Sequence, residues 1–371
     1  MENPSRLDPD SVKTISPAED VVVVSAEELR NLVRDVLKAA GADQRNADRV
    51  AEALVSSNLC GVETHGVWHL AGYVNAIKSG DIVPTEWPEI ISATPTTALV
   101  SGNWTFGHVT AKFAMEIAIE KAQAQNVSVV GIVKSGHIGR LGEYVELAAS
   151  KGLIAMMWGG GQGVEVPAAV PYGGRKRVLH TNPVAMAFPV GSGSPMMFDI
   201  ATTALSGVKI VDARDQNKPL PPDSIVDKDG NPTTNAADFF EGGAHVPFGK
   251  HKGYAFMMAA EFLGMILTAS DRYADPKRGG PIFRHHGTAF IVIKPDIFRP
   301  MEDFLAHGEE ICSQIRNVPP APGFKEVLVP GDPEARTRAK RRREGIPIPK
   351  ELWQKISELP RAQVFVEIDS E

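Results

Sequence analysis

The sequence predicts an α/β protein with a substantially parallel sheet. Apolar runs at residues 127–133, 153–158, 184–190 and 196–200 have the length and composition of buried strands. Segments with helical periodicity lie between or beside these runs, and that alternation favours crossover connections between parallel strands. The chain before these runs carries mainly helical patterns, so we expect a helical N-terminal part joined to an α/β unit.

Three helices are expected in the N-terminal part. Ser25 and Glu28 have the spacing of a capping box, which opens a helix that Gly41 ends. Two further amphipathic helices follow, one up to about residue 60 and one over residues 64–80. Residues 1–20 are polar and aperiodic, which indicates a flexible arm.

The same patterns predict further elements along the chain. Residues 215–235 are rich in Pro, Asp, Gly and Asn and are expected to form a long loop. Strands are also expected at residues 288–293 and 325–329, and helices at residues 111–124, 144–148, 301–317, 334–344 and 350–359.

Composition and charge exclude several classes of protein. The 371 residues include 39 Lys and Arg against 45 Asp and Glu, and a net charge of −6 disfavours binding to nucleic acid. Cys60 and Cys312 are too few for a disulfide framework, and the acidic N-terminus lacks the pattern of a signal peptide, so we expect a cytoplasmic protein. The apolar run 253–270 approaches the length of a membrane span, but Glu261 at its centre favours a helix buried in a soluble core.

The first candidate site is the segment from Thr64 to Tyr73. Thr64 is a suitable N-cap that places His65 in the first turn of the third helix, where His65, His69 and Tyr73 share one face. A helix N-terminus disfavours an imidazolium, so His65 should be neutral near pH ~7 and able to exchange a proton with a hydroxyl or carbonyl. Two structural histidines, or a metal pair with HxxxH spacing, would give the same pattern, although no third metal ligand is evident.

The second candidate is a glycine-rich turn at residues 135–142, between a buried strand and a helix. Glycines let the backbone approach a ligand, and a helix N-terminus favours an anion such as a phosphate. The spacing is GxxGxxG rather than the dinucleotide fingerprint GxGxxG, and no acid follows about 20 residues later, so a Rossmann site is disfavoured. On its own, such a turn is more often structural.

Three shorter clusters have less specific patterns, at residues 181–183, 199–203 and 251–254. The last places Lys252 beside Gly253 just before the apolar run, where a phosphate could be held. Each cluster is also compatible with turn or capping chemistry. The basic run 340–343 is expected to be a solvated helix face.

Together these motifs resemble the type 2 malate/L-lactate dehydrogenase family, which includes ureidoglycolate, sulfolactate, diketogulonate and hydroxycarboxylate dehydrogenases and reductases. The resemblance covers nearly the whole chain after the arm, in the order and spacing of the family. The motifs that carry it are GVETHGVWHL, SGHIGRLGEY, HTNPVAMAFP, MMFDIATT, DGNPTTN, HKGYAFMMAAEFLG and VPGDPEARTR.

The resemblance implies a non-Rossmann α/β fold in which a mixed sheet binds NAD or NADP. Residues 126–287 would form the cofactor-binding domain, and residues 21–125 with 288–371 a substrate and dimerisation domain. The chain would be a homodimeric oxidoreductase that transfers a hydride between NAD(P) and a 2-hydroxy acid/2-oxo acid pair, with neither nucleic acid nor membrane as partner. The alternatives are an NAD(P)H-dependent cyclic imine carboxylate reductase, or a catalytically silent nucleotide- or metal-binding protein.

The resemblance also assigns roles to residues. His65 would exchange the substrate proton, His137 would lie beside the nicotinamide and substrate, and Thr64 and Tyr73 would complete the catalytic group. The substrate-binding candidates are His69, which stands where the family has an arginine for the substrate carboxylate, and Arg140, for which a cofactor-phosphate contact is the alternative. No metal ligand is assigned. Cofactor contacts would come from His137, Gly139, Thr181, Asn182, Pro183, Asp199, Ile200, Ala201, Thr202, His251, Lys252, Gly253, Gly331 and Asp332.

Overall fold

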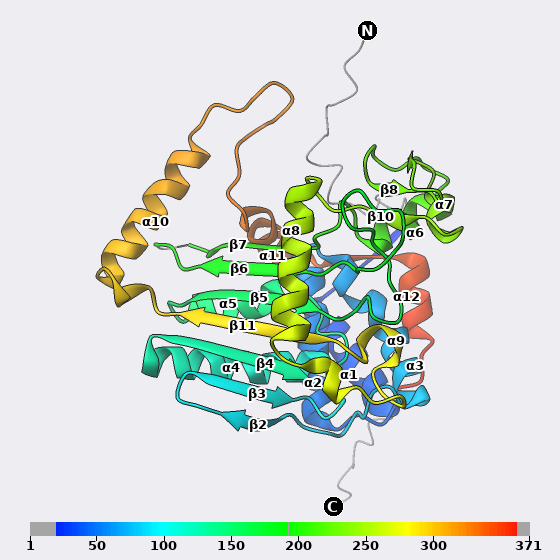
Figure 1. The fold of residues 1–371 in the computed structure, drawn as a ribbon, viewed down its shortest axis with the longest axis horizontal. Coiled ribbons are helices and arrows are strands. Elements are labelled where there is room, and N and C mark those ends of the chain that lie inside the picture. Colours follow the sequence, from blue (N-terminus) through cyan, green and yellow to red (C-terminus); the bar gives the residue numbers. More distant parts are fainter. Residues whose placement is uncertain (1–19, 192, 362–371) are drawn as a thin grey trace, which may run out of the picture.

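A computed structural model describes residues 20–191 and 193–361, and its centre is a seven-stranded sheet (Figure 1). Within the described sheet only β3 and β4 pair in parallel, and the other neighbouring strands are antiparallel. From one edge to the other, the strands are β2 (Glu89–Ala93), β3 (Thr97–Ser101), β4 (Val127–Val133), β11 (Gly287–Ile293), β5 (Ile154–Gly160), β6 (Val184–Phe188) and β7 (Met196–Ile200).

This sheet confirms a mixed α/β fold, whereas the expectation of a substantially parallel sheet is wrong. The strands β4 and β5 are joined by a crossover through α5 (Gly142–Ser150) and point in the same direction. However, β11 lies between them and is antiparallel to both. Because β2 and β3 precede residue 126 and β11 runs past residue 287, the sheet extends across both expected domain boundaries.

Helices cover both faces of the sheet. In β11, Phe290 and Val292 face a core formed with α4 (Gly107–Gln125) and α5. Ile291 between them faces the opposite side, where α8 (His251–Ala260) continues into the π-helical turn Glu261–Ile266. Figure 1 shows α8 lying across this face. The alternation is typical of a strand that is buried on both sides.

The apolar run 253–270 forms α8 and its π-helical continuation, but it is not buried on all sides as expected. Its inner side packs on Trp158, whereas Phe262, Ile266 and Leu267 are 57%, 54% and 58% exposed. The reason is its place as the outer layer over the sheet, which leaves one side of an apolar helix facing outward. In the described part of the chain, no helix is both long and apolar enough to cross a bilayer.

The N-terminal helices form a second core with the C-terminal segment. The first helix, α1 (Ala26–Ala39), begins at the predicted cap, where Ser25 Oγ accepts the Glu28 amide at 3.1 Å. Strand β1 (Val21–Val24) pairs with β12 (Ile346–Pro349), and α12 (Lys350–Ser357) packs beside them on α1, α2 (Gln44–Leu59) and α3 (Leu70–Ser79). Of the expected arm, only Asp20 lies within the described residues.

The third expected helix begins later than predicted. Two 3-10 turns, Glu63–His65 and Val67–His69, precede α3, and no side chain caps either of them. The Asn58 side chain accepts the Val67 amide at 2.9 Å, and a Cβ on Gly66 would lie only 2.2 Å from Asn58 Oδ1. The backbone break therefore needs glycine at residue 66, and the prediction of Thr64 as a helix N-cap is wrong.

Smaller elements surround the sheet. The expected strand at residues 325–329 is not formed, because the Val329 amide donates to Asp332 Oδ2 at 2.9 Å in a turn rather than to a neighbouring strand. The expected loop at 215–235 contains part of a small sheet ordered β10-β8-β9. The elements are α6 (Gly207–Asp215), β8 (Ile225–Val226), β9 (Pro232–Thr233), α7 (Ala236–Phe240), β10 (Ala244–His245), α9 (Gly280–Phe283), α10 (Met301–Arg316) and α11 (Asp332–Glu344), with 3-10 turns at Ser270–Tyr273 and Pro295–Ile297.

The packing of β11 can be tested by truncating one of its buried side chains. Phe290 is fully buried in the strand that joins β4 and β5, so Phe290→Ala should lower the free energy of unfolding by about 3–5 kcal/mol. The matched control is Phe298→Ala, at a side chain that is 93% exposed. This change should alter the free energy of unfolding by less than about 0.5 kcal/mol. Urea denaturation followed by circular dichroism measures both, and equal effects would contradict this account of the core.

Candidate active site

A cluster of aromatic rings brings together residues from two separate parts of the chain. His65 and His69 come from the two 3-10 turns, Tyr73 from α3, and His137 from the turn after β4. The ring of His137 stacks on that of His65 with a centroid distance of 5.7 Å and lies 4.5 Å from that of His69. His69 and Tyr73 stack at 5.8 Å. The structure thus places four of the sequence-predicted site residues in mutual contact.

A hydrogen bond joins Tyr73 to His137. The Tyr73 hydroxyl lies 2.7 Å from His137 Nδ1, and burial raises the pKa of this phenol well above its usual range. The phenol therefore stays protonated and can donate to Nδ1 or accept from it. A neutral imidazole has one N–H, so the tautomer in which Nδ1 accepts from Tyr73 carries its proton on Nε2.

Thr64 contacts both neighbouring histidines. Its Oγ1 lies 3.0 Å from His65 Nδ1, and its carbonyl oxygen lies 2.8 Å from His69 Nε2. A carbonyl only accepts, so His69 donates from Nε2 and keeps the lone pair on Nδ1. Thr64 thus holds the His65 ring with its side chain and the His69 ring with its backbone.

These imidazoles are neutral at neutral pH because they are largely removed from water. Burial lowers the pKa of His65 to about 4, helped by the charge of Arg140, and lowers that of His69 to about 4 as well. Burial and the neighbouring histidines also lower the pKa of His137. The sequence analysis also predicted a neutral His65, because a helix N-terminus was expected to disfavour its imidazolium form. In the structure the main cause of the neutral state is burial.

Two residues that the sequence analysis missed complete the cluster. His108 from α4 meets the Tyr73 ring edge-on at 5.5 Å, and neither of its ring nitrogens has a partner among the described residues. Phe283 from α9 lies 5.6 Å from the His137 ring. No local pattern marks either residue, because each reaches the site through the packing of a distant element. Gly107 also matters here, since a Cβ there would lie 2.3 Å from the His137 carbonyl oxygen.

Arginines from α11 support the segment that carries His65. Arg341, expected on a solvated face, instead binds the Glu63 carboxylate and the Asn58 carbonyl, so that expectation is wrong for this residue. The Arg338 guanidinium binds Glu146 on α5 and donates to Cys60 Sγ at 3.2 Å. These contacts connect α11 to the segment that precedes His65.

Arg140 lies inside the same region, close to His65. Its side chain is buried and donates to Glu146 Oε2 at 3.1 Å, while its Nε and Nη1 have no partner among the described residues. The charge of Arg140 also acts on Asp199, at the end of β7. A buried guanidinium with two free donors is the strongest anion-binding feature near the histidines.

One group of predicted cofactor residues is joined by hydrogen bonds around Thr202. Thr202 Oγ1 donates to the carbonyls of Thr181 and Asn182, at 2.9 and 3.0 Å. The Asn182 side-chain amide donates to Glu261 Oε1 at 2.7 Å, and the Gly161 backbone amide donates to Glu261 Oε2 at 2.9 Å. The segments after β5 and before β6 therefore meet at the Glu261 carboxylate, and the segment after β7 is bonded to the segment before β6 through Thr202. Glu261 was not among the predicted site residues, although an acid within an apolar run was a usable signal.

The other predicted cofactor residues differ in their surroundings. The Asp199 carboxylate accepts a hydrogen bond from the Gly142 backbone amide at 2.7 Å and so lies at the start of α5. Gly139 and Arg140 belong to the turn that leads into this helix. His251 and Lys252 are exposed at the start of α8. Both Asp332 oxygens accept from Arg316, at 2.8 and 3.0 Å, which leaves that carboxylate less free for a ligand than predicted. Gly331 packs against the Met197 backbone, and Pro183 packs against Gly159. Ile200 and Ala201 follow Asp199 in the sequence, and Gly253 follows Lys252.

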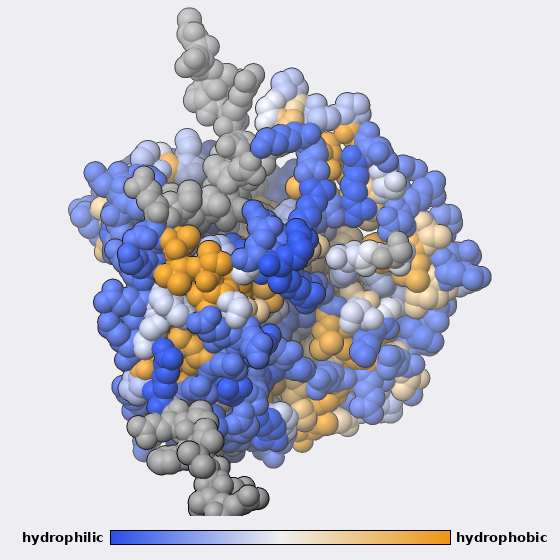
Figure 2. Space-filling view, turned by 180° about the vertical axis from the view of Figure 1, so that it is seen from behind, coloured by the Kyte–Doolittle hydropathy of each residue, from blue (hydrophilic) through white to orange (hydrophobic). Residues whose placement is uncertain are grey.

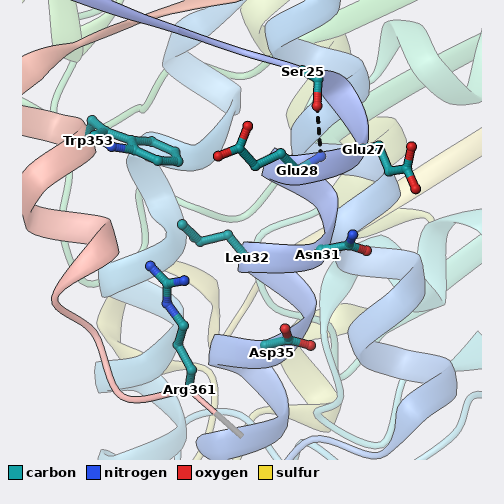
Figure 3. A pocket seen from close by; sticks show the side chains of 8 residues that line it. All are labelled: Ser25, Glu27, Glu28, Asn31, Leu32, Asp35, Trp353 and Arg361. Carbon is teal, nitrogen blue, oxygen red and sulfur yellow. Dashed lines mark hydrogen bonds between the residues drawn. The ribbon is translucent and has the colours of Figure 1, made fainter. Parts of the chain in front are cut away.

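Two cavities elsewhere contain none of the predicted site residues. A cavity of about 380 Å³ lies between α1 and α12 and is lined by the carboxylates of Glu27, Glu28 and Asp35 (Figure 3). The Arg361 side chain also lines this cavity, so three carboxylates face one guanidinium. A second cavity, of about 700 Å³, is lined by Trp104, Lys134 and the 3-10 turn at residues 270–273, among others. Within residues 20–191 and 193–361, no group of three or more His, Cys, Asp or Glu could hold a metal ion.

The buried imidazoles make folding depend on pH. Burial lowers the pKa of His65, His69, His180 and His286 from 6.5 to about 4. Between these values the unfolded chain binds protons that the folded chain does not, so the stabilisation is complete above pH 6.5 and is lost as the pH falls toward 4. We expect the urea midpoint to fall steadily from about pH 7 to about pH 5. A midpoint that stays constant over this range would contradict the neutral state of these rings.

Comparisons with known proteins agree with this arrangement. A family model described as malate/L-lactate dehydrogenase matches residues 24–357. L-sulfolactate dehydrogenase from Methanocaldococcus jannaschii is 35% identical over 339 residues, which are 91% of this chain and 96% of that protein. The structure of malate dehydrogenase from Entamoeba histolytica matches with a TM-score of 0.85 at 28% identity, covering 92% of this chain and 97% of that one.

A further solved structure, that of Δ1-piperideine-2-carboxylate reductase from Pseudomonas syringae pvar. tomato, matches with a TM-score of 0.80 at 29% identity. It covers 91% of this chain and all of that one. These matches extend over both the sheet and the N-terminal helices that carry the histidine cluster. This chain therefore belongs to the malate/L-lactate dehydrogenase family, whose members are oxidoreductases that use a nicotinamide cofactor.

Proposed function

We propose that this protein transfers a hydride between NAD(P) and a 2-hydroxy acid/2-oxo acid pair, with His65 exchanging the proton. The observation that carries the proposal is the contact between the neutral rings of His65 and His137. We propose that His65 donates from Nδ1 to Thr64 Oγ1, which leaves a lone pair on its Nε2, and that His137 accepts from Tyr73 at Nδ1 and donates from Nε2. A carbonyl or hydroxyl bound beside the two rings would then meet a donor and a proton acceptor.

The proton chemistry follows from the low pKa of His65. In the oxidation direction, neutral His65 takes the hydroxyl proton while the substrate carbon loses its hydride. In the reduction direction His65 must first be protonated, which an anionic substrate nearby would favour because opposite charges raise the pKa of an imidazole. Tyr73 is hydrogen-bonded to His137 Nδ1 and would hold that ring in place, so we propose that it acts as a positioning residue rather than a proton donor to substrate.

A nicotinamide dinucleotide fits the polar groups that the site leaves free. When bound, the cofactor accepts or supplies the hydride at its nicotinamide ring. The buried Nε and Nη1 of Arg140 are suited to a phosphate or to a substrate carboxylate, and the backbone around Gly136 leaves room for a ligand. The turn at 137–142, the segments joined by Thr202, and exposed Lys252 would hold the rest of the cofactor, either NAD or NADP.

A cyclic imine carboxylate is the second candidate substrate. The match to a piperideine-carboxylate reductase supports it, and a donor at His137 Nε2 beside His65 suits an imine nitrogen as well as a carbonyl oxygen. The 2-oxo acid remains the first choice because the other two relatives named above are a sulfolactate and a malate dehydrogenase.

The protein is also proposed to act as a homodimer in the cytoplasm. The outer side of α8 and its π-helical turn exposes Phe262, Ile266 and Leu267, a set of apolar side chains that a second copy would cover. By contrast, the opposite face of the molecule is mostly hydrophilic with separate apolar patches (Figure 2). Cys60 and Cys312 are both free and buried, which is typical of a reducing compartment.

Replacing the proposed proton-exchanging residue tests the function. His65→Ala should lower kcat by about 10²–10⁴-fold, because general acid–base catalysis is lost, while the dissociation constants of NADH and NADPH stay nearly unchanged. Absorbance at the NAD(P)H band measures turnover with a panel of 2-oxo acids and cyclic imines, and fluorescence titration measures cofactor binding. A kcat near that of the wild type would contradict the role of His65 and move it to His137.

The dimer proposal predicts the effect of a charge on the outer side of α8. Ile266→Glu should convert the dimer to a monomer, since an unpaired carboxylate would be buried in the interface. The control is Ile90→Glu on the edge strand β2, at a side chain that is 47% exposed and lies outside the proposed interface. Light scattering during gel filtration gives the mass, and a monomeric wild type would overturn the proposal.

A further inference from the structure

We propose that Arg140 binds the carboxylate of the 2-oxo acid, and that this contact makes His65 take up the proton that it gives to the substrate. The inference rests on the proposed function and assigns the free donors of Arg140 to the substrate rather than to a cofactor phosphate. The negative charge of the substrate then prepares the site for reduction.

Most of the Arg140 guanidinium lacks an acceptor. The side chain is 2% exposed, Nη2 donates to Glu146 Oε2 at 3.1 Å, and Nε and Nη1 have no partner among the described residues. Nε carries one N–H and Nη1 carries two, so three donors are unpaired at a site removed from the solvent. Buried donors of this kind carry a cost unless a ligand or an ordered water accepts from them.

The nearby acids of the protein are engaged elsewhere. Both oxygens of Glu146 accept from Arg338, at 2.7 and 2.6 Å, so one carboxylate serves two guanidinium groups. The Asp199 carboxylate accepts the Gly142 backbone amide at 2.7 Å and forms no ion pair with Arg140 among the described residues. The two arginines therefore keep an excess positive charge, which suits an anion.

Arg140 lies beside the proposed proton-exchanging ring. Burial, together with the charge of Arg140, lowers the pKa of His65 to about 4, so the two groups are close enough to interact. Arg140 belongs to the same turn as His137, whose ring stacks on that of His65 at 5.7 Å. A Cβ added at Gly136 in this turn would meet no heavy atom within 4 Å outside its chain neighbours, which leaves room for a ligand.

The chemistry of the two possible ligands favours the substrate at this position. In a 2-oxo acid the carboxylate is bonded to the carbonyl carbon, so a substrate whose oxygen faces His65 brings its carboxylate close to that ring. In a nicotinamide dinucleotide a ribose separates the phosphates from the nicotinamide ring, which places them farther from the reacting carbon. A guanidinium beside His65 therefore suits the carboxylate better than a phosphate.

The groups around His65 leave Arg140 as the charge that opposes its protonation. Burial lowers the pKa of His69, His108 and His137 and raises that of Tyr73, so these four rings are uncharged at neutral pH. The other titratable and charged groups of the region are the pairs Glu63–Arg341 and Glu146–Arg338, Asp199 at the start of α5, and the Cys60 thiol beside Arg338. A carboxylate bound at Arg140 would offset its charge and raise the pKa of His65.

The coupling gives a defined order of events in reduction. The acid binds at Arg140, His65 takes up a proton from the solvent, and the carbonyl carbon then receives the hydride. The carbonyl oxygen takes the proton from His65 Nε2, which returns the ring to its neutral state and completes the 2-hydroxy acid. One hydride and one proton enter per substrate, which balances the oxidation of NAD(P)H to NAD(P)⁺.

Substrate pairs that differ in charge test the role of Arg140. Each pair is a 2-oxo acid of the panel and the amide of the same acid, beginning with pyruvate and pyruvamide. The wild-type protein should reduce the acid with a kcat/KM about 10–100-fold above that of the amide, as expected for a charge-assisted contact. Arg140→Gln should bring this ratio close to one, and Arg140→Lys should keep part of it. Arg342→Gln, at an exposed side chain of α11, is the matched control and should leave the ratio unchanged.

Proton uptake tests the coupling separately. Oxamate, an unreactive anion similar in shape to pyruvate, is titrated into the protein with bound NADH or NADPH, by calorimetry in two buffers of different ionisation enthalpy. At about pH 6.5, near the ordinary pKa of an imidazole, binding should take up about 0.1–0.5 proton per site. In Arg140→Gln this uptake should be lost, while the dissociation constants of NADH and NADPH stay nearly unchanged.

The outcomes separate this inference from the proposed function. A wild-type ratio near one, or an unchanged ratio in Arg140→Gln with a normal melting temperature, would overturn the assignment of Arg140 to the substrate; weaker NAD(P)H binding in that variant would then move it to a cofactor phosphate. A wild-type protein that does not bind oxamate, or binds it without proton uptake, would overturn the coupling. Absence of turnover with all acids and imines, in a protein that binds NAD(P)H, would overturn the proposed function itself. If Arg140→Gln fails to fold, the wild-type ratio, the oxamate titration and Arg140→Lys still decide the question.

Discussion

The insertion of β11 between β4 and β5 is the constraint on which the rest of the structure depends. Its backbone pairs with both neighbours along their length, and its side chains reach the cores on both faces of the sheet. The segment that leads into it carries Phe283 and His286, so the same insertion brings an aromatic ring against His137. A strand from late in the chain thus completes both the sheet and one wall of the site.

Desolvation determines the chemistry of that site. The structure removes several imidazoles from water and surrounds them with one another, so their neutral forms are favoured without a paired charge. Charged groups lie beside the imidazoles, where Arg140 and Arg338 share the carboxylate of Glu146 and leave one positive charge in excess. The cluster therefore combines neutral rings that can donate or accept hydrogen bonds with a neighbouring cation.

Glu261 shows how a single polar residue organises the opposite end of the site. An acid in an apolar helix carries a cost unless its oxygens are paired, and here the Gly161 amide and the Asn182 side chain pair them. Asn182 also has a positive φ of 37°, so its loop adopts a conformation that needs such support. The π-helical turn begins at Glu261, and this start aligns Glu261 with the loops before β6 and after β5.

The sequence by itself determined the elements whose signal is local. The strand at 127–133 and the strand at 196–200 coincide with β4 and β7, because buried strands need continuous apolar runs, and Ser25 caps α1 as its spacing to Glu28 predicted. The residues His65, His69, Tyr73 and His137 were recognised from motifs, and the structure brings them into contact. Only the tertiary structure decided the strand order, the contributions of His108, Phe283 and Glu261, and the proton position on His69. These depend on contacts between residues far apart in the chain and on exclusion of water, and neither is encoded in local spacing.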